Sequence, residues 1–162
     1  MMRFYEEIRV GDRVELGAHL FTAADIKIFA RQFDPQAFHV DEEEGLRSLY
    51  GGLIASGWHT ASMWMRKLVD YRKREAEAMR ARGERIPQVG PSPGFRELRW
   101  FRPVFVGDTV SYAVEIIDIR ISQSRPDRGI VNMLALGHNQ DGVRVMSFET
   151  ATFVERRDSS PP

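Results

Sequence analysis

Residues 21–70 read FTAADIKIFARQFDPQAFHVDEEEGLRSLYGGLIASGWHTASMWMRKLVD, and this stretch decides the fold. It places an aspartate and a histidine five residues apart, Asp34 and His39. A glycine turn at Gly51 and Gly52 follows, and a long helix is predicted to begin at Gly57. The apolar residues on one face of this helix are Trp58, Ala61, Met65, Leu68 and Val69. We expect the rest of the chain to form a wall around the helix and to hold the Asp–His pair against its first turn.

Two shorter helices are predicted on either side of the pair. Thr22 supplies an N-cap oxygen and Asp25 stands at the capping-box position, which favours a helix over residues 23–33. This helix should end at the step from Asp34 to Pro35, because a residue before proline disfavours the helical conformation. The acidic run 41–44 predicts a second short helix. Asp41 either caps that helix or orients His39, and the cap is favoured.

The remaining chain is predicted to be mainly strands. Residues 4–20 are expected to form an opening strand or short hairpin around a turn at 11–12, and residues 95–101, 109–121, 129–138 and 143–154 alternate like strands. Residues 139–142 should be a hairpin turn. The charged residues after Val69 either continue the long helix or fray, with Gly83 as the stop. The proline and glycine loop 87–94 is a candidate border of the site.

This order of elements indicates an α+β domain, in which one antiparallel sheet packs on one long helix. We expect a single domain over residues 1–156 and a disordered tail over residues 157–162. One sheet face cannot hide a helix that carries Trp58, Met63, Trp64 and Met65. A second subunit is therefore expected to cover the rest.

The composition excludes several classes of function. Lys plus Arg and Asp plus Glu both total 23, so no basic field indicates a nucleic-acid partner. The absence of cysteine excludes disulfides and thiolate chemistry. No run approaches the roughly 18 apolar residues of a membrane span, and no targeting segment precedes the first strand, so we expect a soluble, cytoplasmic protein. No histidine spacing indicates a metal site.

Three separate motifs carry a resemblance to a known family. Residues 33–41, FDPQAFHVD, followed by residues 51–57, GGLIASG, resemble the MaoC-like dehydratases, which include the (R)-specific enoyl-CoA hydratases. Residues 100–109, WFRPVFVGDT, are similar to the family's later segment. The hydratases typically read Asp-x-Asn-Pro-x-His, whereas here Pro35 directly follows the aspartate and Gln36 replaces the asparagine. The resemblance implies a dimeric hotdog fold, with a curved antiparallel sheet around a central helix and the active site between subunits.

The resemblance also implies an activity, the reversible hydration of a trans-2-enoyl thioester to a 3-hydroxyacyl thioester. Coenzyme A would be part of the substrate, with an acyl carrier protein as the alternative carrier, and no separate cofactor is implied. Asp34 and His39 would share a water and divide the proton transfers. The backbone N–H of Gly57, at a helix N-terminus, would stabilise the enolate oxygen.

Other polar residues near the motifs have weaker claims. Ser56 is expected to help shape the pocket. His59 is a candidate substrate-binding residue, although a core or surface histidine is favoured. His19 and His138 stand in strand-like contexts and are expected to be structural.

Two other functions remain open. A hotdog thioesterase commonly uses a carboxylate on the long helix, but here Asp70 comes only after more than three turns. A non-catalytic acyl-binding subunit would need neither Asp34 nor His39.

Overall fold

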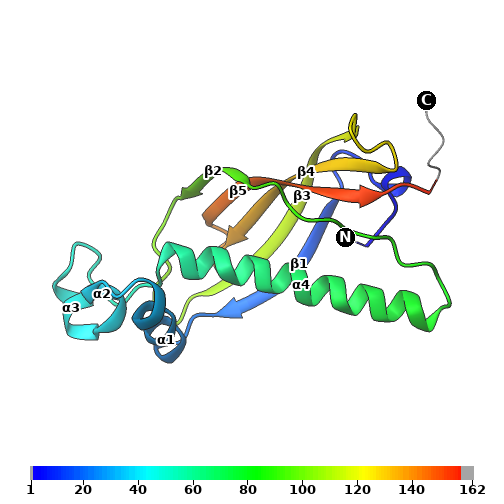
Figure 1. The fold of residues 1–162 in the computed structure, drawn as a ribbon. Helices are drawn as coiled ribbons and strands as arrows, with labels where there is room; N and C mark the ends of the chain where they lie inside the picture. Colours follow the sequence, from blue (N-terminus) through cyan, green and yellow to red (C-terminus); the bar gives the residue numbers. More distant parts are fainter. Residues whose placement is uncertain (1, 158–162) are drawn as a thin grey trace.

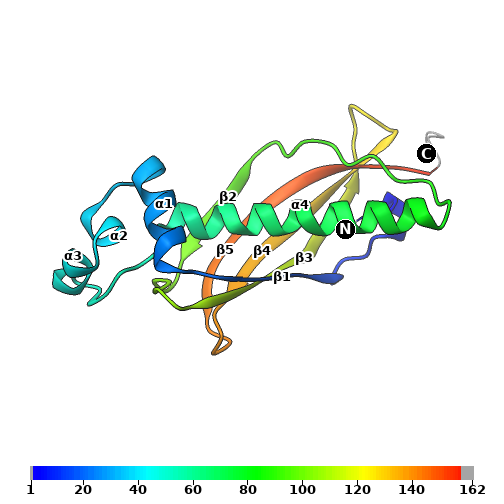
Figure 2. The same cartoon turned by 90° about the horizontal axis from the view of Figure 1, so that it is seen from below.

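The computed structural model describes residues 2–157. Its longest element is α4 (Gly57–Ala81), which lies along one face of an antiparallel sheet (Figures 1 and 2). Within the described residues the sheet has five strands in the order β1-β3-β4-β5-β2. The strands are β1 (Arg13–Leu20), β2 (Phe95–Trp100), β3 (Thr109–Ile121), β4 (Arg128–His138) and β5 (Arg144–Glu155). The α+β arrangement expected from the sequence is confirmed.

Three short helices gather at the N-terminal end of α4, as Figure 1 shows. They are α1 (Ala23–Phe33), α2 (Ala37–Val40) and α3 (Glu42–Arg47). Thr22 caps α1 by accepting a hydrogen bond from the Asp25 N–H at 3.1 Å. Asp41 caps α3, because its Oδ1 accepts from the N–H groups of Glu43 at 2.8 Å and Glu44 at 3.0 Å. The predicted bounds of α1 and the predicted cap of α3 are thus confirmed.

Hydrogen bonds across the core fix the position of α4 on the sheet. The helix buries Trp64 and Leu68 toward the strands. The Trp64 Nε1–H donates to the Ala113 carbonyl oxygen at 2.9 Å, and the Tyr112 hydroxyl donates to the Thr60 carbonyl oxygen at 3.1 Å. Both bonds are buried, so a shift of the helix along the sheet would leave polar groups without partners.

The charged second half of α4 continues the helix rather than fraying. The helix runs through residue 81 and ends at Arg82, after which Gly83 adopts φ 70°, a left-handed conformation that suits glycine. Its other face leaves apolar side chains in solvent. Trp58, Met65 and Val69 are 50%, 49% and 37% exposed.

The opening segment differs from the expected strand or hairpin. Residues Tyr5–Glu7 form a 3-10 helix, η1, and the first strand begins only at Arg13. Phe4 and Ile8 are buried, whereas Val10 is 60% exposed. Apolar positions four residues apart fit a helical turn, while the alternation assumed for a strand required Val10 to be buried as well. The turn at residues 11–12 is present, with Gly11 at φ 88°.

The proline and glycine loop between α4 and β2 runs beside β5. The Gly90 N–H donates to the Phe153 carbonyl oxygen at 2.7 Å. Proline has no N–H, so the stretch around Pro91 and Pro93 cannot form a regular strand ladder. Threonine hydroxyls of β5 supply hydrogen bonds in place of the ladder. Thr152 donates to the Gly90 carbonyl oxygen and Thr150 donates to the Gly94 carbonyl oxygen, both at 2.9 Å.

The C-terminal tail, predicted to be disordered over residues 157–162, lies outside the described residues from 158 onward. Residue 157 itself is bonded to the 3-10 helix, because the Arg157 N–H donates to Glu6 at 3.0 Å. In the part of the chain that the structure describes, no helix is both long and apolar enough to cross a membrane.

Candidate active site

Asp34 and His39 meet near the first turn of α4. Asp34 is the C-cap of α1, where its N–H donates to the Ala30 carbonyl oxygen at 2.8 Å. Pro35 then turns the chain, and the single turn of α2 carries His39 back toward the aspartate. The His39 Nε2 and the Asp34 Oδ2 are 3.4 Å apart.

The orientation of the His39 ring is set by a backbone carbonyl. His39 is 4% exposed, and its Nδ1 lies 2.8 Å from the Ile54 carbonyl oxygen. A carbonyl oxygen only accepts hydrogen bonds, so Nδ1 must carry the hydrogen of the neutral ring. Nε2 is then left with a lone pair on the side of Asp34, where it can accept a proton.

The Asp34 carboxylate is held from two directions. The Ser56 hydroxyl donates to Oδ2 at 2.7 Å, and the Gln36 side-chain amide donates to Oδ1 at 2.9 Å. Burial acts to raise the pKa of Asp34, but these hydrogen bonds and the neighbouring His39 outweigh it, and the pKa is lowered from its usual value. The carboxylate is therefore ionised at neutral pH.

The N-terminus of α4 faces the same place. Ser56 is the N-cap, and its hydroxyl oxygen accepts from the Trp58 N–H at 3.2 Å. Gly57 is the first helical residue, and its N–H has no hydrogen-bond partner among residues 2–157. Such a free N–H, at the positive end of the helix dipole, is suited to an oxyanion.

Gly57 is required here for a reason beyond substrate access. A Cβ at this position would lie 2.5 Å from the ring of Trp100. The Trp100 Nε1–H also donates to the Gly57 carbonyl oxygen at 2.9 Å. The indole of β2 therefore lies directly against the start of α4, in space that any other side chain would need.

These groups line one cavity of about 460 Å³, which is within the range of roughly 300–1,000 Å³ typical of small-molecule sites. Its polar lining includes Asp34, Gln36, His39, Ser56 and Thr60. Its aromatic lining consists of Phe38, Tyr50, Trp58, Trp100 and Phe101. Among the described residues that line it, Asp34 is the single carboxylate. The cavity thus combines one acid–base pair with an aromatic wall and one arginine, Arg102.

The structure brings four of the five candidate site residues together, namely Asp34, His39, Ser56 and Gly57. His59 does not line the cavity. Its ring stacks on Phe29 of α1, with the centroids 4.5 Å apart and the planes at 5°. We therefore do not retain His59 as a substrate-binding residue.

Neither His19 nor His138 lines the cavity. Asp41 caps α3, so it is not the group that orients His39.

Three groups that matter for the geometry were missed by sequence reasoning. The Ile54 carbonyl has no sequence signal, since every residue carries one. Gln36 stands out in the sequence only as a departure from a motif, although its amide holds Asp34. Trp100 is 43 residues from Gly57 along the chain, and nothing local indicates that the two are in contact.

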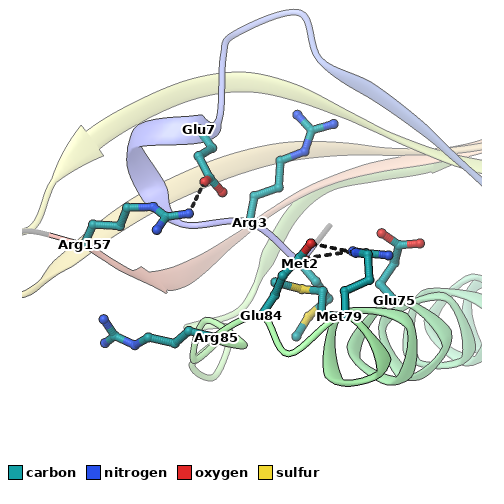
Figure 3. A pocket seen from close by; sticks show the side chains of 9 residues that line it. Met2, Arg3, Glu7, Glu75, Met79, Glu84, Arg85 and Arg157 are labelled. Carbon is teal, nitrogen blue, oxygen red and sulfur yellow. Dashed lines mark hydrogen bonds and ion pairs between the residues drawn. The ribbon is translucent and has the colours of Figure 1, made fainter.

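A larger hollow of about 660 Å³ lies at the other end of α4 (Figure 3). Most of its charged side chains are in ion pairs. Arg157 pairs with Glu7, and Arg82 pairs with Glu84. The other two lining arginines are paired as well, Arg3 with Asp12 and Arg85 with Glu155. All four lining arginines are therefore paired, whereas Glu75 is in no ion pair among the described residues. No histidine lines the hollow, so it lacks the acid–base pair of the first cavity.

No metal centre is indicated in residues 2–157. They contain no group of three or more His, Asp or Glu side chains placed to hold a metal ion.

Comparison with known proteins identifies the family. Residues 7–135 match the model of the MaoC like domain, so the chain belongs to this family. A solved MaoC-like dehydratase from Rhodospirillum rubrum is 38% identical, with a TM-score of 0.79, over 96% of this chain and 99% of that one. Mesaconyl-CoA hydratase of Cereibacter sphaeroides is 31% identical over 84 residues, which are 49% of this chain and 24% of that protein.

The fold is that of the hotdog hydratases. The R-hydratase PhaJ1 from Pseudomonas aeruginosa superimposes with a TM-score of 0.68, over 99% of this chain and 95% of that one. At 21% identity this likeness establishes the fold alone. The expected hotdog architecture, with a long central helix against a curved sheet, is confirmed.

Proposed function

We propose that this protein is a hydro-lyase that adds water reversibly to a trans-2-enoyl thioester, with coenzyme A as the carrier. One observation carries the proposal. A histidine of fixed tautomer and an ionised aspartate point at each other across 3.4 Å, beside a free helix N-terminus. Family membership supports the same chemistry, since relatives in this family are named as hydratases.

The hydrogen-bond pattern suggests how the pair would work. Asp34 enters the cycle ionised, and the Nε2 of His39 enters as an acceptor because Nδ1 carries the hydrogen. Both groups therefore begin as bases that can bind one water between them. The water oxygen bonds to the β-carbon while one of its protons passes to the pair, and the same proton is then delivered to the α-carbon.

The electrons of the carbon–carbon double bond pass through an enolate during this addition. The negative charge develops on the thioester oxygen, and the Gly57 N–H would donate a hydrogen bond to it. A preorganised donor of this kind typically contributes about 10²–10³ in rate. Ser56 contacts both the oxyanion site and the acid–base pair. Its hydroxyl oxygen caps α4, and its hydroxyl hydrogen is donated to Asp34.

A thioesterase is less well supported by the geometry. Asp70 is bonded to Arg66 at 2.9 Å on the surface of α4 and does not line the cavity. That hydrogen bond, with the neighbouring positive charges, lowers the pKa of Asp70. No second carboxylate among the described lining residues stands ready to activate water at the thioester carbonyl.

The test is a pair of assays on one sample. Hydration of crotonyl-CoA removes the absorbance of the conjugated thioester, and a thiol reagent reports free coenzyme A in parallel. We expect the absorbance to fall without thiol release, and Asp34→Asn to lower kcat/KM by about 10²–10⁴ while remaining folded. Thiol release would identify a thioesterase instead. A broad enoyl-CoA panel with neither signal would favour an acyl-binding subunit.

We further propose that the chain functions as a homodimer. Trp58, Met65 and Val69 of α4 and Phe95 and Trp100 of the edge strand β2 are all at least 37% exposed. An apolar surface beside an open strand edge is typical of a protein–protein interface. The mass of the protein in solution tests this, and a strictly monomeric protein would contradict it.

A further inference from the structure

A second cavity adjoins the candidate active site and is not used by the proposed chemistry. It has a volume of about 360 Å³ and lies between α4, β2 and β5. Its walls are Trp58, Ala61, Ser62, Met65, Ser92, Gly94, Phe95, Leu98, Phe148 and Thr150. Trp58 is the one described residue that lines both this cavity and the catalytic one. Its indole therefore stands between them.

The second cavity, which we call the apolar cavity, is suited to a hydrocarbon. No charged side chain is among its described lining residues. The hydroxyls of Ser92 and Thr150 lie 2.9 Å apart, and each also donates to the Gly94 carbonyl oxygen. The hydroxyls of Ser92 and Thr150 already have partners, and Ser62 is an exposed residue that water can reach, so none of the three lining hydroxyls requires a polar ligand. Burial of an alkyl chain here would gain free energy from its apolar area alone.

Trp58 is held in place by Trp100. The two rings meet edge to face, with centroids 5.4 Å apart and planes at 78°, an arrangement favoured by aromatic pairs. Trp100 is itself fixed by its hydrogen bond to the Gly57 carbonyl oxygen and by its contact with the bare α-carbon of Gly57. The position of Trp58 is thus tied to the same helix turn that would bind the thioester.

We propose that Trp58, supported by Trp100, determines acyl-chain length by separating the apolar cavity from the catalytic cavity. This inference rests on the proposed function. With Trp58 in place the acyl group is confined to the catalytic cavity, so short enoyl thioesters are preferred. Removal of the indole joins the two cavities and admits a longer chain.

The experiment compares kcat/KM for trans-2-octenoyl-CoA with kcat/KM for crotonyl-CoA. We expect the native protein to favour crotonyl-CoA. Each methylene that becomes buried contributes roughly fourfold, so Trp58→Ala should raise the octenoyl-to-crotonyl ratio by about tenfold or more. Trp58→Phe keeps an aromatic ring against Trp100 and should change the ratio less than Trp58→Ala does.

Two further variants make the result specific to the cavity. Leu49→Ala trims an exposed apolar side chain that lines neither cavity and lies outside the proposed dimer surface, so it should leave the ratio unchanged. In the Trp58→Ala background, Met65→Trp should refill the apolar cavity and return the ratio toward that of the native protein. Thermal unfolding of each variant checks that it is folded, and Trp58→Leu replaces Trp58→Ala if the alanine variant is not.

A binding measurement separates this inference from the proposed function. Calorimetry with butyryl-CoA and octanoyl-CoA, which lack a double bond, reports chain preference without turnover. A rise of about tenfold in the octanoyl preference of Trp58→Ala would support the partition even if the native protein hydrated nothing. Hydration of crotonyl-CoA with an unchanged ratio in folded Trp58→Ala would overturn the partition and leave the proposed function intact.

Discussion

Two histidines near the start of α4 are equally buried, but their ring nitrogens have different surroundings. His39 is 4% exposed and His59 is 5% exposed. His39 has a carbonyl on one ring nitrogen and a carboxylate near the other. His59 stacks on Phe29 and also contacts the Phe21 ring, and its Nδ1 has no partner among the described residues. Burial therefore does not identify a functional histidine, whereas the placement of its two nitrogens does.

The electrostatic consequence follows from these surroundings. Burial lowers the pKa of His59 to about 4, with a smaller contribution from His19, so the ring is neutral at neutral pH and packs like an aromatic side chain. His39 keeps one nitrogen open to the cavity and one fixed by Ile54. The same residue type thus forms part of the core at one position and a candidate base at the other.

The largest effect should come from removing the cavity-facing nitrogen. His39→Ala is expected to lower kcat/KM for crotonyl-CoA by about 10²–10⁴, because no other described imidazole lines the cavity. His39→Asn, which can still donate to Ile54, should be similarly impaired. His59→Phe is the matched control and should retain most of the activity. Equal losses in His39→Ala and His59→Phe would erase the distinction between the two histidines.

A smaller but still large effect is expected at the helix start. Gly57→Ala brings a methyl group to 2.5 Å from the Trp100 ring, which must move or push α4 away. We expect a loss of about 1–3 kcal/mol in the free energy of unfolding and a fall in kcat/KM. Trp100→Ala should make room for the methyl group, so the double variant should be less destabilised than the sum of the two single changes. Strict additivity in denaturant unfolding would argue against the contact.

Ser56 allows its two roles to be separated. Ser56→Ala removes the N-cap and the hydroxyl that holds Asp34, and should cost about 1 kcal/mol of stability. Ser56→Gly also removes the hydroxyl, but glycine is tolerated as an N-cap at a cost of only a few tenths of a kcal/mol. Both variants should raise the pKa of Asp34 and move the acid limb of the pH–rate profile to higher pH. If the acid limb of the pH–rate profile stayed at the same pH in both variants, Ser56 would not be lowering the pKa of Asp34.

The last effect concerns His59 and appears only at acidic pH. Unfolded His59 binds a proton near its usual pKa of about 6.5, whereas folded His59 does so only near 4. Stability is therefore lost as the pH falls through this window, by about 2 kcal/mol after allowance for solvent screening. His59→Phe should lack this part of the acid sensitivity in urea unfolding at pH 7 and pH 4.5. If the free energy of unfolding fell by the same amount between pH 7 and pH 4.5 in both proteins, His59 would not be the source of this acid sensitivity.

Much of the site could be predicted from neighbouring residues in the chain. The spacing of Asp34 and His39, the glycine turn and the start of α4 all depend on residues a few positions apart. Thr22 and Asp41 were recognised as caps for the same reason, since capping involves residues two or three positions away. The opening segment was mispredicted, because Phe4, Ile8 and Val10 fit a loose alternation and only packing shows which of them is buried.

What the sequence by itself determined is the order and type of the main elements, the family, and the residue pair at the centre of the site. These follow from periodicity, capping and short motifs, which act over a few residues. Only the tertiary structure decided that the Ile54 carbonyl orients His39, that Trp100 occupies the space beside Gly57, and that Trp58 lines two cavities. Trp100 and Gly57 are 43 residues apart in the chain, and their contact depends on how β2 packs against α4. Such contacts arise from the packing of whole elements, so no local pattern records them.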